Sequence, residues 1–256
     1  MQNGAILFDP LVDMADSRKG RCALLRSMHI IWLMYAISHA ATALALKRRY
    51  PGASLWPLLI AVQFVELIWV VLTYAGIEHV SVVGATIHLD FLPYSHSVAT
   101  GVVIGLVVWA AMSGSSAGRR IGLALAIGVF SHIVLDVVHH EPDIRLLPFP
   151  WGPRFGLGLI RHPLADLLVE IAFCVLCWLY FRGSLALLVG LVFLNLLNLP
   201  AMFPRPSMGE TIAEHPAVLT TLILIQIVLT WIAVWWLSRR SRREGYWRRP
   251  RNLSAP

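Results

Sequence analysis

A short polar segment in the middle of the chain concentrates residue types that bind metals or transfer protons. It runs from Ser131 to Asp143 and reads Ser-His-Ile-Val-Leu-Asp-Val-Val-His-His-Glu-Pro-Asp, at the end of an apolar stretch long enough to cross a membrane. At about 100° per residue, four of its side chains fall within an arc of roughly 100° on a helix; these are His132, Asp136, His139 and His140. Such side chains are costly to place in lipid, so we expect them to converge on one site.

Two other segments carry residues of the same kind. Earlier in the chain, the loop before the apolar run 97–112 contains Asp90 and His96. Further along, His162, Asp166 and Glu170 are spaced i, i+4, i+8 at the start of another apolar run. At 1.5 Å per residue, Glu170 would lie about 10 Å below the end of its helix and His132 about 9 Å below the end of its own. Two polar rows of matching depth are expected to face each other or a wet cavity.

Imidazole nitrogens and carboxylate oxygens are ligands for Zn²⁺, Mn²⁺ or Fe²⁺, and a mixed set can leave positions open for water. We therefore expect a divalent metal, zinc first and manganese or iron as alternatives, with His96, His132 and Asp136 as the core ligands. Asp90, His139 or His140 would complete the shell. Asp166 or Glu170 would act as general base or hold the water. The alternative is that the i,i+4 His–Asp pair only locks helix packing by a hydrogen bond.

Composition assigns the chain to the membrane proteins. Hydrophobic residues make up 57% of the 256 residues, and the mean hydropathy is +0.69. Several apolar runs approach the roughly 20 residues needed to cross a bilayer, and they are continuous rather than alternating, which favours helices over a barrel. The expected fold is an all-α, polytopic transmembrane helical bundle of about seven spans, with six possible. The runs are 28–46, 55–74, 97–112, 121–138, 163–181, 184–203 and 216–237.

Charge predicts how the bundle is oriented. The net charge is +7, and seven arginines lie between Arg239 and Arg251, just after the last apolar run. A basic tail in that position is typical of a cytoplasmic membrane anchor rather than of nucleic-acid binding. With the tail inside, the loop 75–96, which has no Lys or Arg, falls outside, as does the loop 139–162. The basic residues between Arg18 and Arg26 disagree with a seven-span topology, and a failed first span would remove that conflict.

The chain is expected to form one membrane domain. Residues 1–27 would be an N-terminal arm, 28–237 the helical domain with its motif core at 90–170, and 238–256 the basic cytoplasmic tail. Cys22, Cys174 and Cys177 make no disulfide framework, and thiols three residues apart inside a span normally just pack. His39 and Glu66 fall near the middle of their spans, where we expect them to pair with each other.

The motifs themselves resemble known families. The chain has Asp90-Phe-Leu-Pro-Tyr-Ser-His96-Ser, then Ser131-His132-x-x-x-Asp136-x-x-x-His140-x-Pro-Asp143, then Gly152-Pro-x-x-Gly-Leu-Gly158. It resembles a family of small bacterial membrane proteins that carry Pro-Tyr-Ser-His-Ser and Ser-His-x-x-x-Asp. More remotely, it is similar to the LexA-regulated, membrane-bound metal-dependent hydrolases, which pair a Thr-His-Ser motif with a His-x-x-x-Asp helix. The match covers about residues 90–170, and this chain has Ser95 where the remoter family has Thr.

Together these features predict a metal-dependent hydrolase of the bacterial inner membrane with its site at the outer interface. A shallow outer site suggests a lipid-linked or phosphoester substrate drawn from the lipid bilayer. Two alternatives remain. A transporter or channel-like protein would use His39, Glu66, Glu170 and Gln226 as path residues, and a noncatalytic scaffold would use the polar residues only to hold helices together.

Overall fold

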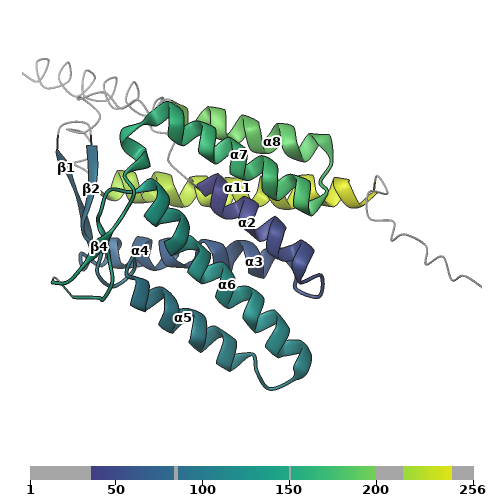
Figure 1. The fold of residues 1–256 in the computed structure, drawn as a ribbon, viewed down its shortest axis with the longest axis horizontal. Helices are drawn as coiled ribbons and strands as arrows, with labels where there is room; N and C mark the ends of the chain where they lie inside the picture. The colour runs from purple at the N-terminus through teal and green to yellow at the C-terminus, as the bar shows by residue number, and fades with distance from the viewer. Residues whose placement is uncertain (1–35, 84–85, 150, 200–215, 244–256) are drawn as a thin grey trace, which may run out of the picture.

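A computed structural model of the chain describes residues 36–83, 86–149, 151–199 and 216–243. Its main elements are helices that lie side by side, with the short strands gathered at one end of the bundle (Figure 1). The helices are α2 (Ala36–Arg49), α3 (Leu55–Val62), α4 (Phe64–Tyr74), α5 (Val98–Ala111), α6 (Ser116–His139), α7 (Pro163–Phe181), α8 (Leu185–Leu197) and α11 (Pro216–Arg243), with the 3₁₀ turn η1 (Leu159–Arg161) before α7.

Helix α2 lies at the centre of the bundle. It packs against α3, α6, α7, α8 and α11. The side chains of Ile37, Ala40, Ala41 and Leu44 are at most 1% exposed. Small residues let neighbouring helices approach closely, as they commonly do within membranes. The polar side chains in its first turn, Ser38 and His39, are therefore held inside the bundle.

Within the described residues, each apolar run expected to span a membrane overlaps a helix or a helix pair, but the count of seven spans is not supported. Among the described residues, three helices are long and apolar enough to cross a membrane: α6, α7 and the Ala217–Arg240 part of α11. The pair α3 and α4, bent by 54°, would make a fourth. Helices α5 and α8 have 14 and 13 residues. At 1.5 Å per residue they are about 20 Å long, shorter than a hydrocarbon core of about 30 Å.

The all-α expectation holds coarsely, because two loops at one end of the bundle form small hairpins. Strands β1 (His79–Val83) and β2 (Thr86–Phe91) pair antiparallel, with His79 opposite Phe91 and Val83 opposite Thr86. Strands β3 (Ile144–Arg145) and β4 (Arg154–Phe155) pair within the loop between α6 and α7.

The second loop is fastened to the end of α6. Leu157 N donates to Val137 O at 2.7 Å, and Gly158 N donates to His140 O at 2.8 Å. Ala99 N at the start of α5 donates to Leu146 O at 3.0 Å. The loop 140–162 is thereby held across the ends of α5 and α6. Of the expected domains, the arm 1–27 lies outside the described residues, and α11 continues into the expected tail as far as Arg243.

Candidate metal centre

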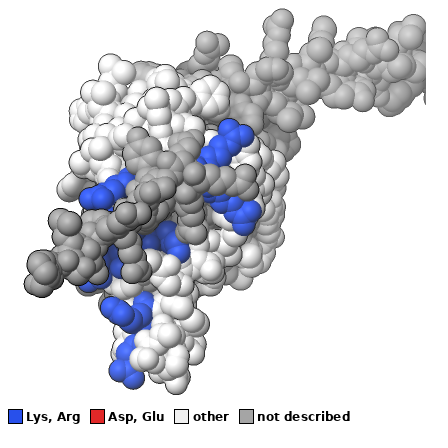
Figure 2. Space-filling model, turned by 90° about the vertical axis from the view of Figure 1, so that its right-hand side faces the viewer, with Lys and Arg blue, Asp and Glu red and all other residues white. Residues whose placement is uncertain are grey.

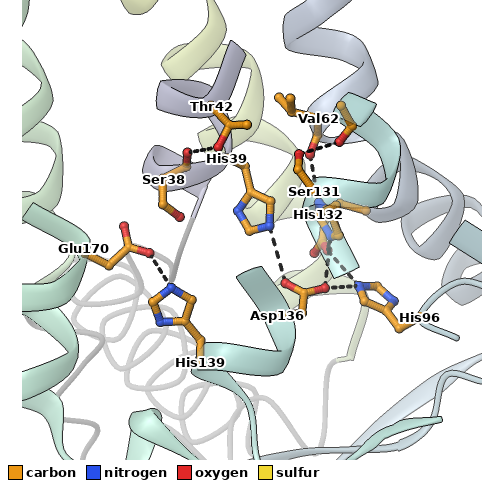
Figure 3. A network of polar contacts seen from close by, with 12 residues as sticks. Ser38, His39, Thr42, Val62, His96, Ser131, His132, Asp136, His139 and Glu170 are labelled. Carbon is orange, nitrogen blue, oxygen red and sulfur yellow. Dashed lines mark hydrogen bonds and ion pairs between the residues drawn. The ribbon is translucent and has the colours of Figure 1, made fainter. Parts of the chain in front are cut away.

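Five ionisable side chains from four parts of the chain meet near the end of α6. They are His39 of α2, Glu66 of α4, His96 just before α5, and His132 and Asp136 of α6. Figure 3 shows His39, His96 and His132 turned toward the Asp136 carboxylate. We call this set the five-residue cluster. It contains all three residues that the sequence predicted as core ligands, and it adds His39 and Glu66.

The spacing of the facing atoms is that of a coordination shell. Asp136 Oδ2 lies 3.3 Å from His132 Nε2 and 3.6 Å from His96 Nε2, while Asp136 Oδ1 lies 3.4 Å from His39 Nε2. Glu66 Oε2 lies 3.2 Å from His96 Nε2 and 3.5 Å from His132 Nε2. Ligand atoms placed tetrahedrally at about 2.1 Å from one ion are about 3.4 Å apart. These five nitrogen–oxygen distances match that edge length, and the ligand atoms fall into two groups that share His132: His39, His132 and Asp136, and Glu66, His96 and His132.

Two atoms of the cluster are buried without a hydrogen bond. Within the part of the chain that the structure describes, His132 Nε2 and Asp136 Oδ2 make none, although their residues are only 1% and 3% exposed. Leaving buried polar atoms without hydrogen bonds costs free energy. A cation between them would satisfy both, so the residues present fit a metal ion.

The outward ring nitrogen of His132 is held by the backbone. Its Nδ1 lies 2.9 Å from Val62 O, and because a carbonyl oxygen only accepts, Nδ1 carries the proton. This leaves the Nε2 lone pair directed at the cluster, which is the tautomer that binds metal. The carbonyl is available because α3 ends at Val62, and the last carbonyls of a helix have no partner within it.

The break between α3 and α4 therefore contributes to the site twice. Gln63, at φ −117° and ψ 10°, separates the two helices. Val62 O on one side of the break holds His132, and Glu66 in the first turn of α4 enters the cluster on the other. A carboxylate in the first turn also interacts favourably with the helix dipole.

His96 is held through its neighbour. His96 Nδ1 lies 2.7 Å from Ser95 Oγ, which lies 2.5 Å from Glu78 Oε2. Burial disfavours the charged ring, but the hydrogen bond and charge of Glu66, together with the charges of Asp136 and Glu78, outweigh it and raise the pKa of His96 above its usual value. The pocket around His96 is thus strongly negative, which favours a cation.

The remaining predicted residues lie elsewhere. His139 Nδ1 is 2.6 Å from Asp166 Oδ1, and His139 Nε2 is 3.1 Å from Glu170 Oε1. The polar rows of α6 and α7 meet at His139, so Asp166 and Glu170 contact His139 rather than the five-residue cluster. Figure 3 shows the contact between His139 and Glu170. All three side chains are buried. We call them the His139 triad.

Two further predicted ligands complete the account. His140 caps the end of α6, within range of the charges of Asp136 and Glu66. The backbone of Asp90 lies in β2, whereas its side chain falls outside the described residues. His39 and Glu66 were expected to pair with each other, but they join the same cluster through Asp136 and through the other two histidines. Sequence reasoning did not predict Glu78, since a single acid in a loop gives no pattern.

Other polar residues of the helices have structural partners. Gln226 Nε2 donates to Asn198 Oδ1 at 2.8 Å, and Asn195 Nδ2 donates to Leu191 O at 2.9 Å. Cys174 and Cys177 are buried free thiols.

Searches against family models, curated proteins and solved structures found no match to this chain.

Proposed function

We propose that the chain is a membrane-embedded metal-dependent hydrolase whose divalent ion, zinc first, is held by His39, His96, His132 and Asp136 of the five-residue cluster, with Glu66 beside it. The observation that carries the proposal is the convergence of three Nε2 atoms and two carboxylates at 3.2–3.6 Å, with His132 already in the metal-binding tautomer. An ion bound there would supply Lewis acidity, which makes water a nucleophile near neutral pH.

Within the cluster, we assign the role of general base to Glu66. Its side chain is 19% exposed, whereas those of His39, His96, His132 and Asp136 are at most 5% exposed. Water and substrate can therefore approach from the side of Glu66. The other four residues would serve as ligands, with Asp136 between the three imidazoles. We expected Asp166 or Glu170 to act as the general base. Both contact His139 instead, so we assign this role to Glu66.

The distribution of charge supports a site on the outer side of the bacterial inner membrane. Helices α2, α6 and α7 each carry cluster or triad residues near one end and basic residues at or just beyond the other; the basic residues are Lys47, Arg48, Arg49, Arg119, Arg120 and Arg182. Figure 2 views the basic end, where blue side chains are present and red ones are not seen. By the positive-inside rule that end, with the C-terminus, is cytoplasmic. A site at the opposite interface would suit a lipid-linked or phosphoester substrate.

Metal content tests the proposal directly. We expect detergent-purified protein to bind about one equivalent of Zn²⁺, and His132→Ala to lose it. His162→Ala is the matched control, because His162 is exposed and lies outside the cluster. Wild-type protein that binds no divalent metal would refute the proposal.

The roles within the cluster are tested by Glu66→Gln. This variant should keep zinc but lose about 10²- to 10⁴-fold in the rate of hydrolysis of a phosphodiester such as bis-p-nitrophenyl phosphate. Loss of the metal together with the rate would instead make Glu66 a ligand.

One observation favours a transporter as second candidate. Broken helices often surround transport sites, and the break between α3 and α4 adjoins the cluster. Asp136, however, lies within the last turn of α6 rather than near its middle. Uptake of Zn²⁺ into proteoliposomes, abolished by His132→Ala and without hydrolytic activity, would favour transport.

A further inference from the structure

A buried carboxylate outside the five-residue cluster is connected to it by one hydroxyl group. Glu78 lies between α4 and β1 and is 1% exposed. Ser95 Oγ donates to Glu78 Oε2 at 2.5 Å, and Ser95 Oγ also lies 2.7 Å from His96 Nδ1. Ser95 is fully buried and His96 is 5% exposed, so water does not compete for these bonds.

The donors and acceptors along this connection have one consistent assignment. A carboxylate only accepts hydrogen bonds, so the single hydroxyl hydrogen of Ser95 is given to Glu78. The Ser95 oxygen must then accept from His96, which places the ring proton on Nδ1. His96 Nε2 donates to Glu66 Oε2 at 3.2 Å, so the ring carries a second proton there, and a bound ion would take the place of that proton while Nδ1–H stays on Ser95. His132 also carries a proton on Nδ1, which it donates to Val62 O.

We propose that Glu78 is a positioning residue for the metal, acting through Ser95 to fix the tautomer and orientation of His96. This inference rests on the proposed metal centre. Partners of this kind orient a ligating histidine and raise its basicity, and their loss typically weakens metal binding about 10- to 100-fold. Through Ser95, the Glu78 carboxylate can orient His96 and raise its basicity although Glu78 itself lies outside the five-residue cluster.

Glu78 also binds the segment before α5 through backbone hydrogen bonds that do not involve the Ser95 hydroxyl. Glu78 Oε1 accepts from Tyr94 N at 2.7 Å and from Ser95 N at 2.9 Å. These two backbone bonds hold the segment before α5 against Glu78 on their own. The Ser95 hydroxyl adds the connection to His96. Removing it should therefore affect how His96 is positioned while leaving the two backbone bonds to Glu78 in place.

The test is a pair of substitutions at Ser95, measured by competition for Zn²⁺ against a chromophoric chelator. Ser95→Ala removes the hydroxyl and leaves both backbone bonds to Glu78, whereas Ser95→Thr retains a hydroxyl. We expect Ser95→Ala to bind Zn²⁺ about tenfold or more weakly and Ser95→Thr to stay close to wild type. The metal-free Ser95→Ala protein should melt a few degrees lower, because Glu78 Oε2 and His96 Nδ1 each lose a buried hydrogen bond, whereas Ser95→Thr should melt near wild type.

A second arm tests whether Glu78 acts through Ser95. Glu78→Gln should weaken Zn²⁺ binding, and combining it with Ser95→Ala should add little, since both changes interrupt one connection. If Glu78→Gln does not fold, the Ser95 pair alone decides. Wild-type Zn²⁺ affinity in Ser95→Ala would refute the positioning role and leave the metal centre standing. Absence of Zn²⁺ binding by the wild type would refute the metal centre and this inference with it.

Discussion

At the scale of single residues, carboxylates with the same helical spacing have different surroundings. Asp136 lies four residues after His132 and joins three imidazoles. Asp166 and Glu170 are also four residues apart, and both contact His139. His139 lies 2.6 Å and 3.1 Å from its two buried carboxylates, whereas the histidine–carboxylate contacts of the five-residue cluster are 3.2–3.6 Å. The closer contacts of the triad favour a charged pair that stabilises the fold, and the wider spacing of the cluster favours binding a cation.

Substitution in the His139 triad should therefore affect folding more than metal binding. Asp166→Asn removes the negative charge beside His139 Nδ1 inside a fully buried site, and breaking a buried ion pair typically costs about 3–5 kcal/mol. We expect a lower melting temperature with Zn²⁺ affinity within about twofold of wild type. Asp143→Asn, at a half-buried position, is the control. Lost Zn²⁺ binding with an unchanged melting temperature would place Asp166 in the metal centre instead.

At the scale of elements, the loop 140–162 is held against α6 by a very close approach of backbone to backbone. A Cβ atom on Gly156 would lie 1.9 Å from Glu141 O and 2.6 Å from His140 O. The Arg161 guanidinium also binds both carboxylate oxygens of Glu141. The loop 140–162 thus covers the end of α6 that carries Asp136, and this close contact requires glycine at position 156.

Gly156→Ala should therefore displace this loop. Overpacking of this kind typically costs about 1–3 kcal/mol, so we expect a melting temperature several degrees lower in detergent. Gly114→Ala provides the control, because a Cβ there would meet nothing within 4 Å. Equal melting temperatures for the two variants would show that the loop does not dock as described.

At the scale of the whole molecule, most of the described Lys and Arg residues lie at the helix ends away from the cluster, and the loop 140–162 at the other end carries Arg145, Arg154 and Arg161 together with Glu141 and Asp143. Cations cap the ends of α2 and α6 away from the cluster, and Lys47 Nζ is bound there by Pro51 O and Ala53 O, both at 2.6 Å. This segregation predicts one orientation in a membrane, with the loop 140–162 outside.

Cysteine labelling tests that orientation. In a Cys22→Ser background, with Cys174 and Cys177 buried, we expect Trp151→Cys to react with a membrane-impermeant maleimide in intact spheroplasts. Trp151 is 69% exposed in the loop 140–162, and Ala117→Cys, exposed at the opposite end of α6, should react only after lysis. The reverse pattern would invert the topology.

Much of the fold could be predicted from the sequence, because apolar runs mark helices directly. Helix α7 begins and ends at the expected residues, Pro163 and Phe181, and α6 contains the whole expected run 121–138. The number of spans could not be predicted this way. Apolarity shows that a segment avoids water but not whether lipid or other helices surround it, and α2 is surrounded by helices.

The sequence by itself determined that this is a helical membrane protein and that His132 and Asp136 share a helix face, since i,i+4 spacing depends only on local helix geometry. Only the tertiary structure decided that His39 and Glu66 join them, while Asp166 and Glu170 turn to His139. Which faces of two helices meet depends on how the whole bundle packs and on where a helix breaks, as α3 does at Val62. Those are long-range properties that spacing along the chain does not encode.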